Sequence, residues 1–239
     1  MKTALITGGA VRIGAQIVKT LHENNYRVLV HYHQSKKSAQ TLCNELNAII
    51  SNSAEMVCAD LNIVSDIEKL SSKIKSLDLL INNASVFYQT PLTNAKHDDW
   101  DNLINVNLKA PYFLATELSN KLKSRNGSII NIVDIHSERP LKNHSIYSIS
   151  KAGLNMLTLS LAKELAPSVR VNGVSPGAII WPQNKGSISD KQKENMLDRV
   201  ALKRQGNPKD IAEAILFLVK SDYITGQIIN IDGGRTLYQ

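Results

Sequence analysis

The sequence predicts an α/β fold, with one doubly wound parallel sheet and helices on both of its faces. Short apolar runs alternate with longer amphipathic stretches along the whole chain, which is the pattern of consecutive strand–helix units. The predicted strands are apolar throughout, as expected where helices cover a parallel sheet on each side. No linker, repeat or low-complexity tract interrupts the pattern, so residues 1–239 are expected to form a single domain.

The elements follow in regular order. Apolar runs predict strands over 4–6, 27–31, 56–58, 79–81, 128–133, 169–172 and 228–231. Apolar side chains three and four residues apart predict helices over 13–21, 39–46, 67–74, 98–123 (one long helix or two consecutive ones), 145–166 and 208–220, with a short polar helix ending at Arg199. Ligands of such sheets bind beyond the carboxyl ends of the strands. The residues that follow each apolar run are therefore the first functional candidates.

Charge is distributed unevenly along the chain. The formal net charge is +7 and the isoelectric point is near 9.3. Residues 1–120 carry 11 basic and 11 acidic side chains, whereas residues 121–239 carry 17 and 10. This excess lies mainly in 121–142 and 185–209. Such an excess is compatible with binding to nucleic acid, to anionic lipid or to an acidic small molecule, or with a solvated surface that binds no specific partner. The solvated surface is favoured because no block of five like charges occurs.

Two isolated cysteines, Cys43 and Cys58, predict neither a disulfide framework nor a metal site. The apolar run at the N-terminus is too short for a signal peptide. No stretch approaches the roughly 18 apolar residues of a membrane span. We therefore expect a cytoplasmic protein that binds neither metal nor membrane.

The first predicted strand leads into a glycine-rich turn over residues 7–14. Glycines let the backbone approach a pyrophosphate, whose charge suits the free N–H groups of the following helix. The turn departs from G-x-G-x-x-G at Arg12, so an ordinary strand–helix turn is the alternative. The residues assigned to a dinucleotide site here are Gly8, Arg12, Ile13 and Gly14.

The second predicted strand ends in a segment without acidic residues, followed by two lysines. An NAD site usually places a carboxylate here for the ribose hydroxyls, and that carboxylate would repel a 2′-phosphate. Arg12, His33 and Ser35 can instead donate hydrogen bonds to such a phosphate. We therefore predict NADPH as the cofactor, with a solvated loop as the alternative. The residues assigned here are His31, Tyr32, His33 and Ser35.

Two further turns border the predicted cofactor. Asp60 follows the third strand and either accepts a hydrogen bond from an adenine amino group or caps the helix that begins near Ile63. The turn over 82–85 follows the fourth strand, and it either lets the adenosine ribose lie close or is purely structural. The cofactor residues assigned to these turns are Asp60, Leu61, Asn83, Ala84 and Ser85.

Tyr147 and Lys151 lie four residues apart in a predicted helix and therefore share one face. A phenol has a pKa of about 10 and exchanges protons poorly near neutrality. A nearby ammonium lowers that pKa and can also hold ribose hydroxyls. Such pairs are common on protein surfaces, but this one lies beside the end of the predicted strand 128–133.

In combination, these motifs resemble the short-chain dehydrogenase/reductase family over nearly the whole chain. The resemblance implies a Rossmann-type fold, a nicotinamide cofactor and usually a homotetramer. It also implies that Tyr147 donates the proton, that Lys151 lowers its pKa and binds ribose, and that Asn107 holds a helix kink and a water of a proton relay. The motifs that carry the resemblance are the turn 7–14, Asn82-Asn83-Ala84, Asn107, Tyr147 with Lys151, and Pro176-Gly177, and the last two residues join the predicted cofactor site.

The chain departs from the family pattern at Asp134, because most members carry a serine about a dozen residues before the tyrosine. A carboxylate would repel a developing alkoxide and would disfavour a tyrosinate. Beside a nitrogen base, it can instead hold or pass a proton. The alternative is that Asp134 is a structural hydrogen-bonding group and that the role of the serine is lost or taken by Ser137.

The departures resemble the pteridine reductases, including the bacterial dihydromonapterin/dihydrofolate reductase branch. They are Arg12, the segments 31–35, 83–92 and 232–235, and Asp134 with the Tyr147–Lys151 pair. The resemblance implies that Phe87 stacks on a pterin whose other face meets the nicotinamide; core packing of Phe87 is the alternative. The predicted substrate-binding residues are Arg12, Ser85, Phe87, Asp134, Tyr147 and Trp181. The predicted catalytic residues are Asp134, Tyr147, Lys151 and Asn107.

The predicted function is NADPH-dependent reduction of a C=N bond in a pterin or dihydrofolate-type substrate. The alternatives are an NADPH-dependent ketoreductase of the 3-ketoacyl or sugar type, in which Asp134 is a misfit, and a non-catalytic NADPH-binding sensor. Residues 178–205 form the predicted substrate loop, where Trp181 either walls the pocket or packs against a neighbour. We expect no nucleic-acid partner and interpret the basic excess as a pocket rim that attracts anionic substrates, such as the glutamate tail of dihydrofolate.

Overall fold

The computed structural model describes residues 1–181 and 189–238. It confirms the predicted fold class, a doubly wound parallel sheet with the strand order β3-β2-β1-β4-β5-β6-β7. The strands are β1 (Lys2–Ile6), β2 (Tyr26–Tyr32), β3 (Ala54–Cys58), β4 (Leu79–Asn82), β5 (Ser128–Ile132), β6 (Arg170–Pro176) and β7 (Ile228–Ile231). The chain moves outward from β1 to β3 and then returns to β4 on the other side of β1. This reversal creates the crevice at which such sheets bind their ligands.

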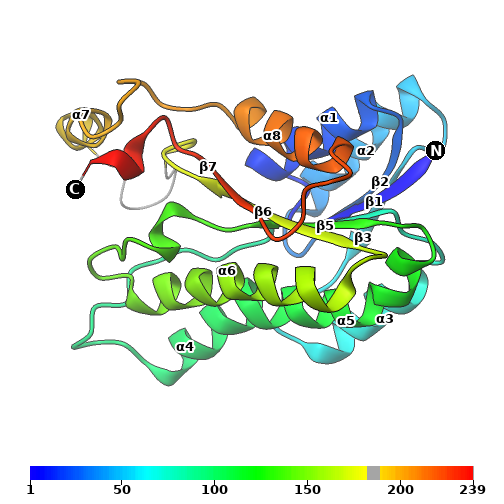
Figure 1. The fold of residues 1–239 in the computed structure, drawn as a ribbon, viewed down its shortest axis with the longest axis horizontal. Helices are drawn as coiled ribbons and strands as arrows, with labels where there is room; N and C mark the ends of the chain where they lie inside the picture. Colours follow the sequence, from blue (N-terminus) through cyan, green and yellow to red (C-terminus); the bar gives the residue numbers. More distant parts are fainter. Residues whose placement is uncertain (182–188, 239) are drawn as a thin grey trace.

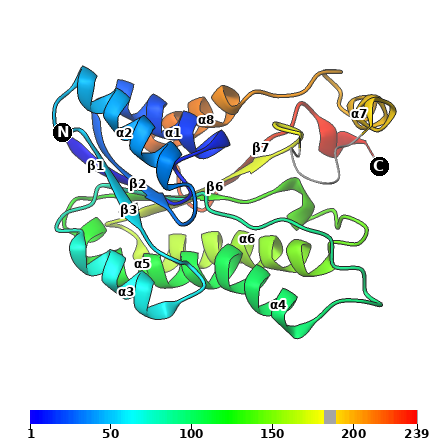
Figure 2. The same ribbon diagram turned by 180° about the vertical axis from the view of Figure 1, so that it is seen from behind.

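Helices cover both faces of the sheet (Figures 1 and 2). One layer contains α1 (Arg12–Glu23), α2 (Lys36–Ile49) and α8 (Pro208–Lys220), and the other contains α3 (Val64–Lys73), α5 (Ala110–Lys123) and α6 (Ser145–Leu165). The shorter α4 (His97–Ile104) precedes α5, and α7 (Asp190–Leu197) lies beside the C-terminal segment.

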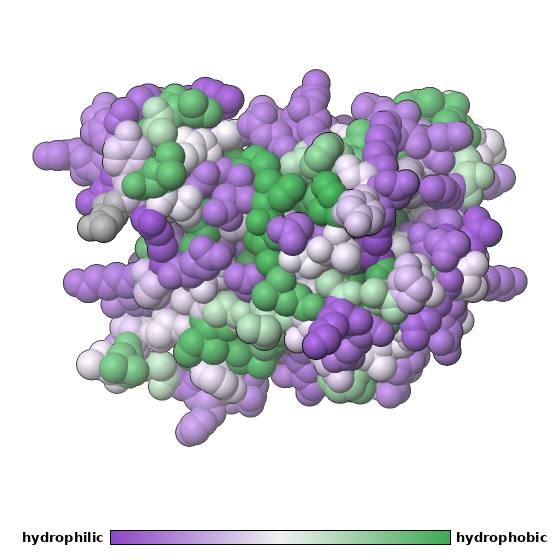
Figure 3. Space-filling view, in the orientation of Figure 1, coloured by the Kyte–Doolittle hydropathy of each residue, from purple (hydrophilic) through white to green (hydrophobic). Residues whose placement is uncertain are grey.

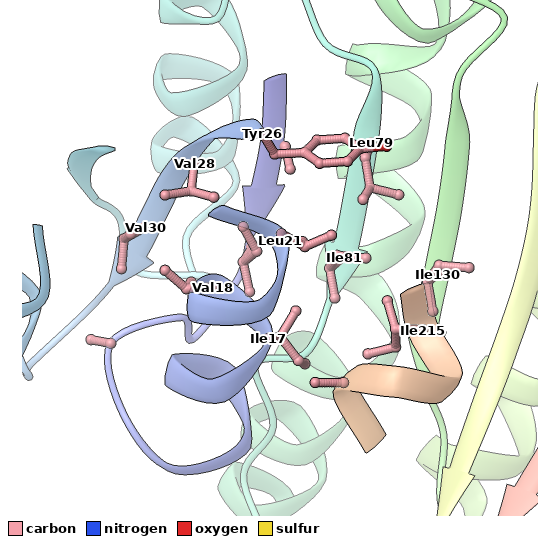
Figure 4. Packing of buried hydrophobic residues seen from close by; sticks show 14 of the residues in the cluster. Ile17, Val18, Leu21, Tyr26, Val28, Val30, Leu79, Ile81, Ile130 and Ile215 are labelled. Atoms are coloured by element: carbon pink, nitrogen blue, oxygen red, sulfur yellow. The ribbon is translucent and has the colours of Figure 1, made fainter. Parts of the chain in front are cut away.

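Each helical layer encloses its own apolar core. In the first layer, Ile17 and Leu21 of α1 and Ile215 of α8 pack against Val28 and Ile81 of the sheet (Figure 4). In the second layer, the apolar faces of α3, α5 and α6 pack on the opposite face of the same strands. Burial on both faces explains why the strands read as continuous apolar runs.

The predicted helical stretch 98–123 consists of two consecutive helices, one of the two predicted alternatives: α4 and α5 are joined by a π-helical turn, η1 (Asn105–Lys109). One element differs from the sequence prediction. Strand β6 continues to Pro176, beyond the predicted end at Asn172, because the buried Asn172 amide donates to the Ile224 carbonyl and accepts from the Gln227 N–H. A polar residue whose hydrogen bonds are satisfied does not end a buried strand.

Within residues 1–181 and 189–238, no helix has both the length and the apolar character needed to cross a membrane. Within the same ranges, no group of three or more His, Cys, Asp and Glu side chains could hold a metal ion.

Candidate active site

The glycine-rich turn after β1 is braced by the turn after β4. The Thr7 hydroxyl accepts hydrogen bonds from the N–H groups of Asn83 (2.9 Å) and Ala84 (3.0 Å), and the Asn83 amide donates to the carbonyls of Thr7 and Gly8. Gly8 has a φ of +60°, and a Cβ on Gly14 would lie 2.1 Å from the Gly8 carbonyl oxygen. The backbone is therefore packed too closely for side chains at these two glycines. Asn83 contributes to the predicted site by holding this turn.

The N-termini of α1 and α2 have the features of phosphate sites. Neither helix has a side-chain cap or an acidic residue in its first turn, so backbone N–H groups and the positive end of each helix are open to an anion. Arg12 opens α1 with a φ of +55°, a left-handed conformation that costs about 1–2 kcal/mol, and its side chain is exposed. Ser35 is the half-buried N-cap of α2, close in sequence to the exposed His33. These donors fit a dinucleotide that carries an additional phosphate.

His31 points into the protein rather than toward a ligand. Its Nδ1 accepts a hydrogen bond from the Gly8 N–H (3.0 Å), and its Nε2 lies 3.2 Å from the Ala59 carbonyl oxygen. Burial lowers the pKa of His31 to about 4, so the ring is neutral at pH 7. Because both ring nitrogens are engaged, His31 ties the turn after β1 to the turn after β3. Tyr32, its neighbour, is also buried.

Replacing His31 with asparagine is expected to weaken the acid sensitivity of folding. Between pH 6.5 and 4 the unfolded chain binds a proton on His31 that the folded chain does not bind. The free energy of unfolding of the wild type therefore decreases as the pH is lowered, by about 2 kcal/mol from pH 6.5 to pH 5. Asparagine can still accept from the Gly8 N–H but does not titrate. Urea unfolding at pH 5 and pH 7 measures the difference, with His33→Asn on the surface as the control. An equal loss of stability in His31→Asn and wild type would contradict this role.

Asp60 does not cap α3, so that alternative is wrong. The N-cap of α3 is Ile63, which has no side-chain cap, and Asp60 Oδ1 instead accepts from the Asn62 N–H at 2.9 Å. Asp60 Oδ2 lies 3.7 Å from Nε2 of His33, which connects the predicted adenine side of the site to its phosphate side. Leu61 is buried beside them.

The ends of β6 and β7 lie close together. The Gly177 N–H donates to the Ile231 carbonyl (3.0 Å), and a Cβ on Gly177 would lie 2.7 Å from Cα of Asp232. Pro176, the last residue of β6, is buried. Trp181 is half-buried and precedes residues 182–188, the part of the predicted substrate loop that lies outside the described residues.

The structure brings together Asp134, Tyr147 and Lys151. The Tyr147 hydroxyl donates to Asp134 Oδ2 at 2.8 Å, and Asp134 Oδ1 accepts from the His136 N–H at 2.8 Å. Lys151 Nζ donates to the Ile132 carbonyl at 2.8 Å and lies 5.9 Å from the centre of the Tyr147 ring. One carboxylate therefore contacts the phenol and also caps the short helix η2 (Ile135–Ser137), so its structural role and its contact with Tyr147 coexist.

Burial favours the neutral forms of Tyr147 and Lys151. Burial raises the pKa of Tyr147 well above 10, and the Asp134 carboxylate raises it further by its charge and its hydrogen bond. Burial lowers the pKa of Lys151 from 10.5 to about 8, while Asp134 acts in the opposite direction. The lowering of the Tyr147 pKa expected from Lys151 is thus outweighed here. At pH 7 the phenol keeps its proton and Lys151 is charged but close to its titration.

Asn107 lies in the π-helical turn, as expected for a residue that holds a helix kink. Its Oδ1 accepts from the Ser85 hydroxyl and the Val86 N–H, and its Nδ2 donates to the Val86 carbonyl and to Ser150 Oγ. An amide side chain offers two acceptor sites and two donors. All four are occupied by protein atoms, so the predicted relay water would have to bind the main chain.

Phe87 is half exposed, which excludes the core-packing alternative. One face of its ring stacks on His144, with 4.7 Å between ring centres and 14° between the planes. The Phe87 and Tyr147 rings form an edge-to-face pair, with 4.8 Å between ring centres and 82° between the planes. His144 therefore leaves at most one face of Phe87 to a planar ligand. His144 is absent from the predicted site residues, although its position immediately before α6, three residues from Tyr147, was a usable signal.

A dinucleotide cradle at the crevice of a doubly wound sheet, with a buried tyrosine–lysine pair beside it, defines a nicotinamide-dependent oxidoreductase. The model of a family described as enoyl-(acyl carrier protein) reductase matches residues 9–236. The chain is 34% identical to the 3-oxoacyl-[acyl-carrier-protein] reductase FabG of Staphylococcus epidermidis, over 98% of each chain. It is 36% identical to the reductase of the same name from Staphylococcus aureus, over 98% of this chain and 97% of the relative. It is 33% identical to pteridine reductase 1 of Leishmania tarentolae, over 98% of this chain and 96% of the relative. The chain belongs to the short-chain dehydrogenase/reductase family.

Proposed function

We propose that this reductase transfers a hydride from NADPH to a C=N carbon of a pterin or dihydrofolate-type substrate. The observation that carries the proposal is the hydrogen bond from the Tyr147 hydroxyl to Asp134, at 2.8 Å. In carbonyl reduction the substrate oxygen becomes an alkoxide, and a carboxylate beside it would raise the barrier. In C=N reduction the ring nitrogen gains a proton, and a carboxylate beside that nitrogen lowers the barrier.

The proposed roles follow from the contacts of each residue. When bound, NADPH supplies the hydride. Tyr147 holds its proton at neutral pH and turns it from Asp134 to the ring nitrogen, and solvent then reprotonates the tyrosinate that is left. Asp134 orients the phenol before the transfer and offsets the positive charge on the ring nitrogen as it gains the proton. Lys151 holds the ribose hydroxyls with the N–H groups that the Ile132 carbonyl leaves free. The open face of Phe87 supports the planar substrate.

The proposed cofactor is NADPH rather than NADH. The first turns of α1 and α2 contain no carboxylate, and Arg12, His33 and Ser35 lie at or beside these helix starts. Asp60 is the nearby acid, and its Oδ2 lies 3.7 Å from Nε2 of His33. The donor set therefore suits a 2′-phosphate better than a free hydroxyl.

A second candidate is a 3-oxoacyl-[acyl-carrier-protein] reductase. The names and identities of the Staphylococcus relatives favour this activity over pterin reduction, as does the description of the matching family. It leaves Asp134 without a catalytic reason, because a carboxylate at the reacting carbonyl is unfavourable.

Parallel assays separate the two candidates. NADPH oxidation is followed with quinonoid dihydropterin, with dihydrofolate and with a 3-oxoacyl thioester at equal concentrations. The proposal expects kcat/KM for at least one of the first two substrates to exceed that for the thioester by about 100-fold or more, as for a site whose polar groups pair with one substrate and are left unpaired by the other. A preference for the thioester would establish the second candidate. Tight NADPH binding without turnover of any substrate would favour a non-catalytic sensor.

We further propose a homotetramer, the assembly usual in the family. Apolar side chains of α5 and α6 that the monomer leaves exposed, Tyr112, Ile149 and Met156, provide material for an interface. Light scattering coupled to size-exclusion chromatography measures the mass, and a monomer at micromolar concentration would contradict the proposal.

A further inference from the structure

A cavity of about 610 Å³ lies between the segment that follows β5 and the C-terminal segment. Its walls are formed by residues within 135–142, by Arg199 after α7, and by Arg235, Thr236 and Tyr238. Figure 1 places the C-terminal segment and the loop before α6 at the same end of the molecule, and Figure 3 shows hydrophilic side chains around the notch between them. The volume lies within the range of small-molecule sites.

Three arginines from distant parts of the sequence converge on this cavity: Arg139, Arg199 and Arg235. Arg139 and Arg235 each donate to the Tyr238 carbonyl, which fixes their direction. The pKa of Arg235 is lowered first by burial and then by the charges of Arg199 and Arg139. The three guanidinium groups are therefore close enough to repel one another.

Within the described part of the chain, no acidic side chain forms an ion pair with this cluster. Among residues 1–181 and 189–238, no carboxylate lies within 4 Å of any of the three guanidinium groups. The charge of Asp232 acts against the lowering of the Arg235 pKa. The two carboxylate oxygens of Asp232, however, already accept hydrogen bonds from the Gly234 and Thr236 N–H groups. Glu138 also lines the cavity and is exposed. The cavity thus has an excess of positive charge that an anion would relieve.

The cavity adjoins the candidate reaction site through Asp134. Oδ2 of this residue contacts Tyr147, and Oδ1 contacts the backbone of His136, which lines the cavity. Two residues along the chain span at most about 7 Å. An elongated substrate whose reacting ring lies at Tyr147 can therefore place a second group in the cavity.

We propose that Arg139, Arg199 and Arg235 bind a carboxylate carried by the substrate, so that the enzyme prefers folate-type substrates with a glutamate tail over pterins without one. Guanidinium groups match carboxylates in shape and charge and bind them in a bidentate manner. The inference rests on the proposed function, because it assigns the tail of the same substrate. It also assigns a role to part of the basic excess, since the stretches 121–142 and 185–209 each contribute an arginine to the cavity.

Arg199→Gln tests the subsite with the least disturbance, because no hydrogen bond of the Arg199 side chain to another described residue is present. The readout is kcat/KM for dihydrofolate and for a dihydropterin without the tail. We expect about a tenfold loss for dihydrofolate, the value of one charge-assisted hydrogen bond, and no change for the tail-less pterin. Lys123→Gln, an exposed change of the same charge at the end of α5, is the control and should preserve the ratio. An equal loss for both substrates, or no loss for either, would overturn the subsite.

Binding of p-aminobenzoylglutamate, measured by calorimetry, tests the subsite without any reaction. We expect binding to the wild type and to Lys123→Gln that weakens with salt, and about tenfold weaker binding to Arg199→Gln. If this pattern holds while no pterin is reduced, the subsite stands and the proposed function fails. If pterins are reduced but Arg199→Gln binds the probe as the wild type does, the proposed function stands and the subsite fails.

Discussion

Asp134→Asn is expected to lower kcat for pterin reduction by about 100-fold or more while the affinity for NADPH stays unchanged. Asparagine can still accept from the His136 N–H through Oδ1, so the cap of η2 is retained. Its amide would donate to the Tyr147 oxygen, whereas the carboxylate accepts from it. The loss then measures the charge and proton-holding capacity of Asp134, which general acid–base catalysis values at about 100- to 10,000-fold.

The pH profile of Asp134→Asn gives an independent readout. The carboxylate raises the pKa of Tyr147 and also that of Lys151, so its removal lowers both. The alkaline limit of kcat, set by a protonated phenol and a charged lysine, should therefore move to lower pH. Glu164→Gln removes an exposed charge from the same helix as Tyr147 and serves as the control. Unchanged turnover and an unmoved alkaline limit in Asp134→Asn would reject its role.

Several features of the fold could be predicted because they depend on local pattern. The apolar runs gave every strand, since a parallel sheet covered on both faces needs apolar side chains on both. The residue pattern of Asn105–Lys109 did not predict a π-helical turn, because these residues suit an ordinary helix, and only the family resemblance implied a kink at Asn107. Its distortion accompanies the four hydrogen bonds of Asn107, which reach Ser85, Val86 and Ser150 in other segments.

In the candidate site, too, some features could be predicted from the sequence and others required the folded structure. Tyr147 and Lys151 share a helical face, and Asp134 follows the adjacent strand, so their proximity followed from spacing and topology. The inward direction of His31 depends on two backbone groups, those of Gly8 and Ala59, which only the folded sheet brings to its ring. The arginine cavity likewise required tertiary structure, because the sequence shows an excess of charge but not where three side chains meet.

Lys151→Met is expected to stabilise the folded protein near pH 7 while it abolishes most of the activity. Lys151 is fully buried, and its pKa falls from 10.5 in the unfolded chain to about 8 in the folded chain. That difference corresponds to a cost of about 3 kcal/mol for keeping the charged form buried below pH 8. Methionine removes this cost but leaves the Ile132 carbonyl without its donor, a loss of about 1–2 kcal/mol. The net gain should be about 1–2 kcal/mol, or several degrees in Tm for a chain of this length.

The sign of this effect should reverse in alkali. Between pH 8 and 10.5 the unfolded wild type holds a proton on Lys151 that the folded protein has released, so the contribution of this residue to stability rises with pH. Above pH 10.5 the lysine is neutral in both states, the burial cost is gone and the hydrogen bond to Ile132 remains. The difference between variant and wild type cancels the other groups that titrate in this range. Chemical unfolding from pH 7 to 11 should therefore show the two stability curves crossing.

A crossing of the two stability curves would distinguish a lysine that destabilises the fold for the sake of function from a lysine that stabilises it. Lys163→Met changes an exposed lysine of the same helix and should leave a difference from wild type that does not vary with pH. If Lys151→Met were less stable than the wild type at every pH, its hydrogen bond would outweigh its burial, and the lysine would be a structural element. If the curves cross while turnover falls, the fold maintains a destabilising charge beside Tyr147 because the reaction uses it, which is the expected trade-off at a catalytic site.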